Sequence, residues 1–132
     1  MPRASNDDTP LPPVVGERLP RGAEAFGVRD KLAGYSLDLT HRDGGAKAHG
    51  FERILGIEIA DIGYLEGAIQ TAVLVIPVSS VRENPPWGHI CVVMVPVRGL
   101  GEKRGRVVAV RTVWEIAGEQ HRPRLANAYC KP

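Results

Sequence analysis

The sequence predicts an α+β domain in which two N-terminal helices pack on one face of a small antiparallel sheet. Two observations lead to this fold class. In the first half, segments 46–55 and 61–75 place apolar residues at helical spacing. In the second half, three strand-like runs at 89–97, 106–116 and 124–130 follow one another across short polar segments, an order typical of an antiparallel meander.

The composition indicates one domain. With 132 residues, of which 43% are hydrophobic, the chain can build a single core. No apolar leader or membrane-length run is visible, and the two cysteines lack metal-ligand spacing, so we expect a cytoplasmic protein without membrane contact. Residues 1–28 are rich in proline and glycine and predict an irregular or disordered tail. Residues 29–132 form the domain.

The N-terminal elements are predicted in order as follows. Residues 31–37 indicate a short extended arm that offers the sheet a fourth strand. A first helix covers 46–55, with Gly56 at the position that follows a helix C-terminus. A second helix begins at Asp61 as N-cap and runs to about Val75. The segment 78–88 contains Pro85 and Pro86 and is predicted as a loop.

The central strand of the meander, RVVAVRTVWEI at 106–116, is the most informative. Its β-branched residues indicate a buried strand, yet Arg111 and Thr112 interrupt the apolar run. Neighbours on a strand point to opposite faces, so if Arg111 faces a site, Thr112 faces the core with Trp114. In the preceding strand, Pro96 indicates an edge, a bulge or a strand end.

Basic residues concentrate in the C-terminal part. The net charge is only +2, but residues 98–132 hold eight basic and three acidic side chains, a local charge of +5. This pattern fits either ordinary solvated charges or a surface that faces phosphate.

Two groups of polar residues are candidates for a site. His41, Lys47 and His49 lie around a Gly-Gly turn and the start of the first helix. On the predicted adjacent strands, Arg111 lies opposite a segment that contains Asn127 and Tyr129. The basic residues Arg106 and Arg124 flank this second group and are candidates for substrate binding.

These residue types are the ones needed for RNA cleavage without a metal or other cofactor. A base removes the proton of the 2′-hydroxyl, an acid protonates the leaving 5′-oxygen, and a cation stabilises the transition state. We assign catalysis to His41, Lys47, Arg111 and Tyr129, and substrate binding to His49, Asn127, Arg106 and Arg124. Structural roles are open for the same residues: a capping role for His41 and an ion pair for Arg111. The carboxylates form no metal-ligand pattern.

The stretch KLAGYSLDLTHRDGGAKAHGFERILGI resembles the opening signature of an uncharacterised bacterial domain family, KLxxYxLxxxHxxGGxKAxxFxxxLG. The end, with VRTVWEI and RLANAYC, is similar to that family's closing strands. It is also similar to the closing strands of ribonuclease toxins of the barnase–EndoU–colicin–RelE superfamily. In these toxins, helices pack on an antiparallel sheet whose polar residues cut RNA.

The resemblance implies a toxin-like endoribonuclease that acts on RNA such as tRNA or mRNA. It also implies a cognate antitoxin or immunity protein as partner. The alternative, of another class, is a non-catalytic protein-binding module, such as an antitoxin-like or scaffold domain that uses the meander to grip a partner.

Overall fold

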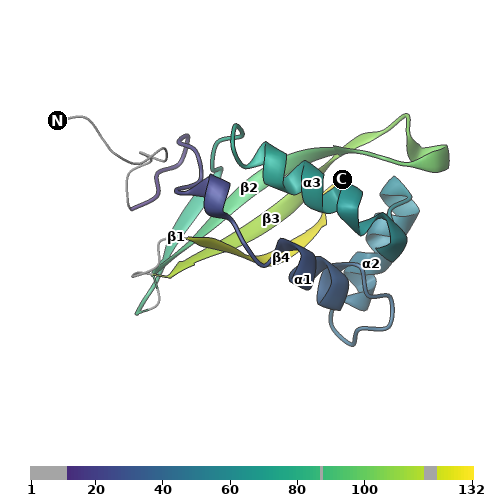
Figure 1. Cartoon of the computed structure of the whole chain (residues 1–132), viewed down its shortest axis with the longest axis horizontal. Coiled ribbons are helices and arrows are strands. Elements are labelled where there is room, and N and C mark those ends of the chain that lie inside the picture. Colours follow the sequence, from purple (N-terminus) through teal and green to yellow (C-terminus); the bar gives the residue numbers. More distant parts are fainter. Residues whose placement is uncertain (1–11, 87, 118–121) are drawn as a thin grey trace.

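The computed structural model describes residues 12–86, 88–117 and 122–132 (Figure 1). Three α-helices, with short 3-10 and π-helical turns, precede or cover an antiparallel sheet of four strands in the order β1-β2-β3-β4. The strands are β1 Ser80–Asn84, β2 Gly88–Arg98, β3 Val107–Ala117 and β4 Pro123–Cys130. The predicted α+β class and the C-terminal meander are confirmed. No helix in these ranges is long and apolar enough to cross a membrane.

The two predicted helices are present. The first is α2, Gly45–Gly50, continued by the π-helical turn η3, Phe51–Leu55. Gly56 ends it at φ +66°, where a Cβ would lie 2.7 Å from the Leu100 carbonyl oxygen. The second is α3, Ile62–Ala72, which packs against β2.

The predicted extended arm is instead helical, which corrects the expectation for 31–37. Helix α1, Val28–Lys31, continues into the π-helical turn η2, Leu32–Ser36. Val28, Leu32 and Ser36 are all buried and lie four residues apart, so a helical stripe rather than a two-residue alternation faces the core. The arm therefore adds no strand.

The fourth strand of the sheet is β1, which lies in the segment predicted as a loop. Its sequence, SVREN, is polar because β1 has a single neighbour and is exposed along most of its length. A short, charged strand is a common way to protect a sheet edge from pairing with another chain. Beyond β1, the free edge of β2 carries Pro96, which has no N–H to offer.

The core lies between the helices and one face of the sheet. Alternate residues of β2 and β3 point into it. Trp114 is fully buried there, and its Nε1 donates a 2.9 Å hydrogen bond to Thr112 Oγ1. The Thr112 hydroxyl in turn donates to the Val93 carbonyl at 2.7 Å. This confirms that Thr112 faces the core with Trp114, and it leaves Arg111 on the opposite face.

A β-bulge in β4 determines which side chains of that strand face the core. Trp114 pairs with Leu125, but Thr112 pairs with Ala128, so β4 holds one extra residue between these two pairs. Without it, Leu125 and Tyr129 would point to the same face. With it, Leu125 is buried in the core, and Tyr129 pairs with Arg111 on the other face.

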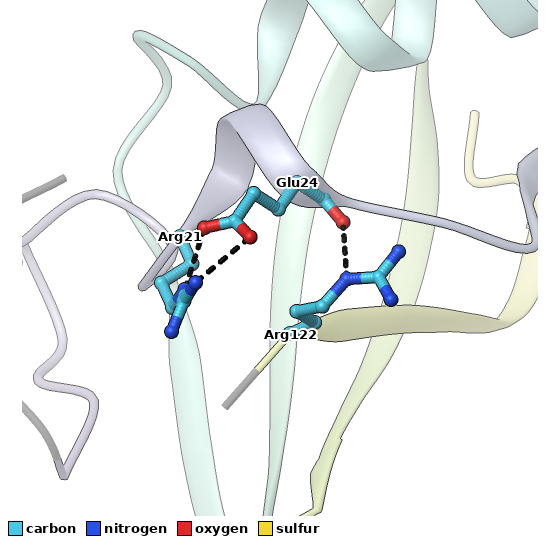
Figure 2. A network of polar contacts seen from close by, with 3 residues as sticks. All are labelled: Arg21, Glu24 and Arg122. Atoms are coloured by element: carbon cyan, nitrogen blue, oxygen red, sulfur yellow. Dashed lines mark hydrogen bonds and ion pairs between the residues drawn. The ribbon is translucent and has the colours of Figure 1, made fainter. Parts of the chain in front are cut away.

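Residues 12–27 run along the domain as an irregular strap. Leu19 is only 1% exposed. Residues 16–18 bond to 77–78, and the Phe26 backbone bonds to Pro123 and Leu125 of β4. Figure 2 shows a further link, in which Arg21 binds Glu24 through two hydrogen bonds and Arg122 donates to the Glu24 carbonyl at 3.4 Å. The described part of the predicted tail is thus irregular but packed, while residues 1–11 lie outside the described ranges.

Candidate functional site

His41 holds the turn before α2. Its Nδ1 accepts hydrogen bonds from the backbone N–H groups of Asp43 and Gly44, both at 2.9 Å. An accepting Nδ1 assigns the ring proton to Nε2. The ring meets that of Tyr35 edge to face, with centroids 4.9 Å apart. His41 is therefore a capping residue whose Nε2–H is its free polar group within the described residues.

The same loop holds a carboxylate near His41. Hydrogen bonds from the hydroxyl and backbone N–H of Thr40 keep the pKa of Asp38 below its usual value. The Asp38 carboxylate therefore accepts its hydrogen bonds from Thr40, in the loop that contains His41.

Lys47 extends from α2 towards two tyrosines. Its Nζ donates a 2.6 Å hydrogen bond to the hydroxyl oxygen of Tyr35 on η2. The same Nζ lies 5.6 Å from the ring centroid of Tyr129 on β4. Since α2 packs beside β4, which is an edge strand, Lys47 joins the helical layer to the far face of the sheet at this edge.

Gly44 allows the turn before α2 to lie close to the backbone of Tyr35. A Cβ on Gly44 would overlap the Tyr35 carbonyl oxygen, so only glycine lets the turn lie this close to η2. Gly44 has φ −90°, so the turn does not need glycine for a positive φ. Close contact between two backbones is the actual requirement.

Arg111 and Tyr129 complete the group. Arg111 Nη1 donates a 3.0 Å hydrogen bond to the Tyr129 hydroxyl across the β3–β4 pair. We name Tyr35, His41, Lys47, Arg111 and Tyr129 the edge cluster. It contains two pairs, each made of a cation and the phenol that accepts its hydrogen bond.

The cations of the edge cluster have no acidic partner in the described ranges. The ion pairs found there join Arg21 to Glu24, Arg29 to Glu66 and Arg124 to Glu115. Lys47 and Arg111 therefore contact phenols instead of carboxylates. Two partly buried cations without a counter-charge favour the binding of an anion.

A cavity of about 420 Å³ adjoins the edge cluster at Tyr35 and His41. It lies between α1, η2 and the start of β4. Its polar wall is formed by Asp30, Lys31, His41 and Arg124, and its aromatic wall by Phe26 and Tyr35. Tyr35 and His41 are thus shared between the cavity and the edge cluster.

The family model for Domain of unknown function DUF6883 matches residues 18–132. The chain belongs to the DUF6883 family. The match includes most of the described strap, which agrees with the packing of Leu19 into the core. Comparison with curated proteins and with solved structures finds no match.

The remaining predicted residues of this DUF6883 chain are divided between the site and other regions. Asn127 shares the sheet face of Tyr129, and its buried Oδ1 has no hydrogen-bond partner in the described structure. Arg124 lines the cavity and is paired with Glu115. Arg106 lies elsewhere and donates to the Ile54 carbonyl at the end of η3. His49 is exposed on α2, outside the contacts of the described cluster.

Tyr35 and Lys31 were not among the residues that the sequence predicted for the candidate site. Both belong to the segment that was predicted to be extended. In the helical conformation they are four residues apart and lie on one face, with Lys31 Nζ 5.3 Å from the Tyr35 ring centroid. A helical stripe at Val28, Leu32 and Ser36 was the signal that would have identified this face.

Within the described ranges, no group of three or more His, Cys, Asp or Glu side chains is arranged to hold a metal ion. Burial raises the pKa of the Cys91 thiol to about 12 and that of Cys130 to about 11. Both thiols therefore stay protonated near neutral pH and are poor nucleophiles.

Proposed function

We propose that this DUF6883 domain is an endoribonuclease of the toxin type that cleaves RNA without a metal ion. The observation that supports it best is the edge cluster, in which Lys47 and Arg111 have no acidic partner among the described residues and converge on Tyr129. This arrangement provides positive charge and O–H groups at one point. A phosphodiester in its transition state requires both.

The reaction is a transesterification. The 2′-oxygen attacks phosphorus, the bond from phosphorus to the 5′-oxygen breaks, and a 2′,3′-cyclic phosphate and a 5′-hydroxyl end result. One proton leaves the 2′-hydroxyl and one reaches the 5′-oxygen, so no water is consumed. Lys47 and Arg111 stabilise the charge that develops on the phosphoryl oxygens.

Tyr129 is the residue best placed to protonate the leaving oxygen. Its hydroxyl accepts from Arg111, so its own proton is directed elsewhere. After transfer, the phenolate lies beside one guanidinium and near one ammonium, which stabilise it. In our proposal the Tyr35 hydroxyl, which accepts from Lys47, takes the proton of the 2′-hydroxyl while its own proton passes on towards Tyr129. This relay replaces the proton that Tyr129 gives to the 5′-oxygen, so no separate base is left charged.

For His41 we propose a positioning role in place of general acid or base, the role that its residue type suggests. Either function needs a proton on Nδ1 at some stage, and this would remove the two backbone hydrogen bonds that hold the turn. We assign His41 to positioning Tyr35 and to donating from Nε2 towards substrate. Its replacement should therefore reduce the rate less than replacement of Arg111.

The biological setting is proposed from the sequence resemblance to ribonuclease toxins. Such an enzyme acts on tRNA or mRNA in the cytoplasm and needs an antitoxin or immunity protein in the cell that produces it. A partner that covers the edge cluster with carboxylates would neutralise Lys47 and Arg111 directly.

A non-catalytic protein-binding module is the second candidate. The observation that favours it is the exposed apolar side chains on α3 and just after it: Tyr64 in the first turn of the helix, and Leu74 and Val75 beyond its last residue, are 40%, 42% and 69% exposed. An exposed patch of this kind is typical of protein contacts. It predicts partner binding that survives replacement of Lys47 and Arg111.

The deciding experiment incubates the purified chain with total RNA and tRNA in the presence of EDTA. We expect cleavage with 2′,3′-cyclic phosphate ends. Arg111→Ala, Lys47→Ala and Tyr129→Phe should each lower the rate on the order of a hundredfold or more. Arg104→Ala and Lys131→Ala are the matched controls, because both side chains are exposed and outside the edge cluster.

Intact RNA with the wild-type protein, together with no effect of Arg111→Ala in a growth assay, would rule the proposal out. Cleavage that EDTA abolishes would reject the metal-free mechanism. Equal losses in Arg104→Ala and Arg111→Ala would show that general positive charge, and not the edge cluster, is responsible.

A further inference from the structure

We propose that the cavity beside Tyr35 holds the nucleobase next to the phosphate at the edge cluster, and that Asp30 and Lys31 make it select guanine. This inference rests on the proposed phosphate site and adds the base that the enzyme reads. The cavity, of about 420 Å³, lies within the range of small-molecule sites.

The position of the cavity fits one nucleotide. Tyr35 has its hydroxyl on Lys47, in the edge cluster, while its ring lines the cavity. His41 also lines the cavity and touches the Tyr35 ring. A phosphate held by Lys47 and a base held in the cavity are then separated by one side chain, a separation that a ribose bridges.

The aromatic walls suit a flat ring. Phe26 and Tyr35 line the cavity, and Arg124, whose guanidinium is paired with Glu115, lines it as well. Unstacked bases of RNA are bound by such surfaces, through stacking on aromatic rings and on arginine. These contacts retain any base and do not choose among the four.

Asp30 supplies the selection. Asp30 is an exposed residue that lines the cavity, and within the described ranges its carboxylate has neither an ion pair nor a side-chain hydrogen bond. A carboxylate accepts two N–H groups side by side. Guanine is the base whose pairing edge presents two adjacent donors, N1–H and N2–H. Lys31, the next residue in α1, lines the same cavity and can donate to the guanine O6.

The other bases match less well. Adenine and cytosine present one amino donor beside a ring nitrogen that is an acceptor, and a carboxylate repels that acceptor. Uracil presents one N–H between two carbonyl oxygens. Each loses one of the two hydrogen bonds to Asp30 and places an acceptor against the charge.

The test measures the binding of the four nucleoside 3′-monophosphates to the full chain by calorimetry. We expect guanosine 3′-monophosphate to bind most tightly. Asp30→Asn should weaken its binding roughly tenfold to a hundredfold, the effect of losing one bidentate contact to a base, and should leave the other three nearly unchanged. Lys47→Ala should weaken all four alike, because it removes a phosphate contact. Glu83→Gln, on β1 at the opposite sheet edge, is the control of equal charge change.

Equal affinities for the four nucleotides, or no binding of any, would overturn the inference. A guanosine preference that Asp30→Asn leaves intact would overturn the role of Asp30. The RNA cleavage assay separates this inference from the proposed function. Cleavage without preference for guanosine would keep the ribonuclease and reject the base site. Asp30-dependent guanosine binding without cleavage would do the reverse.

Discussion

Lys47 Nζ donates a 2.6 Å hydrogen bond to the hydroxyl oxygen of Tyr35. This contact joins the helix predicted from the sequence to a helical turn that was not predicted. It fixes the end of a long, flexible side chain at the edge of the sheet, where Tyr129 and Arg111 meet it. The geometry of the edge cluster depends on this bond.

Tyr35→Phe should therefore lower the rate of RNA cleavage while the fold persists. The ring stays, so the contact with His41 remains, but Lys47 loses its acceptor. We expect a loss on the order of tenfold to a hundredfold in kcat, measured on a fluorogenic RNA. Tyr64→Phe removes a comparable hydrogen bond, to the Arg98 carbonyl outside the edge cluster. Cleavage by Tyr64→Phe should match wild type, and equal losses in both variants would contradict the role of Tyr35.

Gly44→Ala should destabilise the protein, because its Cβ would overlap the Tyr35 carbonyl oxygen. We expect a decrease of about 1–3 kcal/mol in the free energy of unfolding, measured by urea denaturation. Gly50→Ala, at the end of α2, is the matched control, since its Cβ would meet no atom within 4 Å. That variant should gain up to about 1 kcal/mol from helix propensity. Equal effects of the two substitutions would show that Gly44 is not a site of close approach.

Leu19→Ala should show that the strap is part of the folded domain. Leu19 is 1% exposed in the core, so its truncation leaves a cavity and should cost about 2–5 kcal/mol of unfolding free energy. Val15→Ala, at a side chain that is 58% exposed, should change stability by less than about 0.5 kcal/mol. If Leu19→Ala is as stable as wild type, the strap does not contribute to the core in solution.

Cys91 should make stability depend on pH in the alkaline range. Burial raises the pKa of its thiol from 9.0 to about 12, so the folded state holds the proton more tightly than the unfolded state. The resulting stabilisation is fully present below about pH 9 and is lost as pH rises towards 12. The difference in unfolding free energy between wild type and Cys91→Ala should thus shrink from pH 8 to pH 11. A constant difference over this range would contradict the burial of the thiol.

The sequence predicted the elements whose apolar pattern is unambiguous. β2 and β3 carry β-branched residues on the core face, and the bounds of both strands lie within a residue or so of those expected. α2 and α3 were found from their apolar stripes. The opposite orientations of Arg111 and Thr112 followed from the two-residue period of a strand, and the buried bond from Trp114 to Thr112 confirms them.

Elements that depend on tertiary context were not predictable in the same way. β1 is polar because it is an exposed edge strand, so its sequence resembles a loop. Segment 28–36 is short and holds two consecutive types of helical turn, which weakens any single period. The bulge in β4 adds one residue that no local pattern reveals, yet it decides that Tyr129 faces Arg111.

The candidate residues that lie together in the structure are those that several elements position. Lys47, Arg111 and Tyr129 lie together because a helix, two strands and a bulge position them. Arg106 was a candidate because of its charge alone. In the structure its guanidinium donates a hydrogen bond to the Ile54 carbonyl. Tyr35 could be found only by recognising segment 28–36 as helical, for which the stripe of Val28, Leu32 and Ser36 is the signal.

The strap also has a consequence for how the chain folds during synthesis. Its backbone bonds to residues 77–78 at one point and, through Phe26, to residues 123–125 at another. Phe26 lies near the start of the chain and meets a strand that the ribosome produces about a hundred residues later. Contacts so distant in sequence form slowly and late. The N-terminal segment can therefore complete its docking only after β4 has been synthesised. The cavity that Phe26 lines is likewise complete only after that strand has emerged.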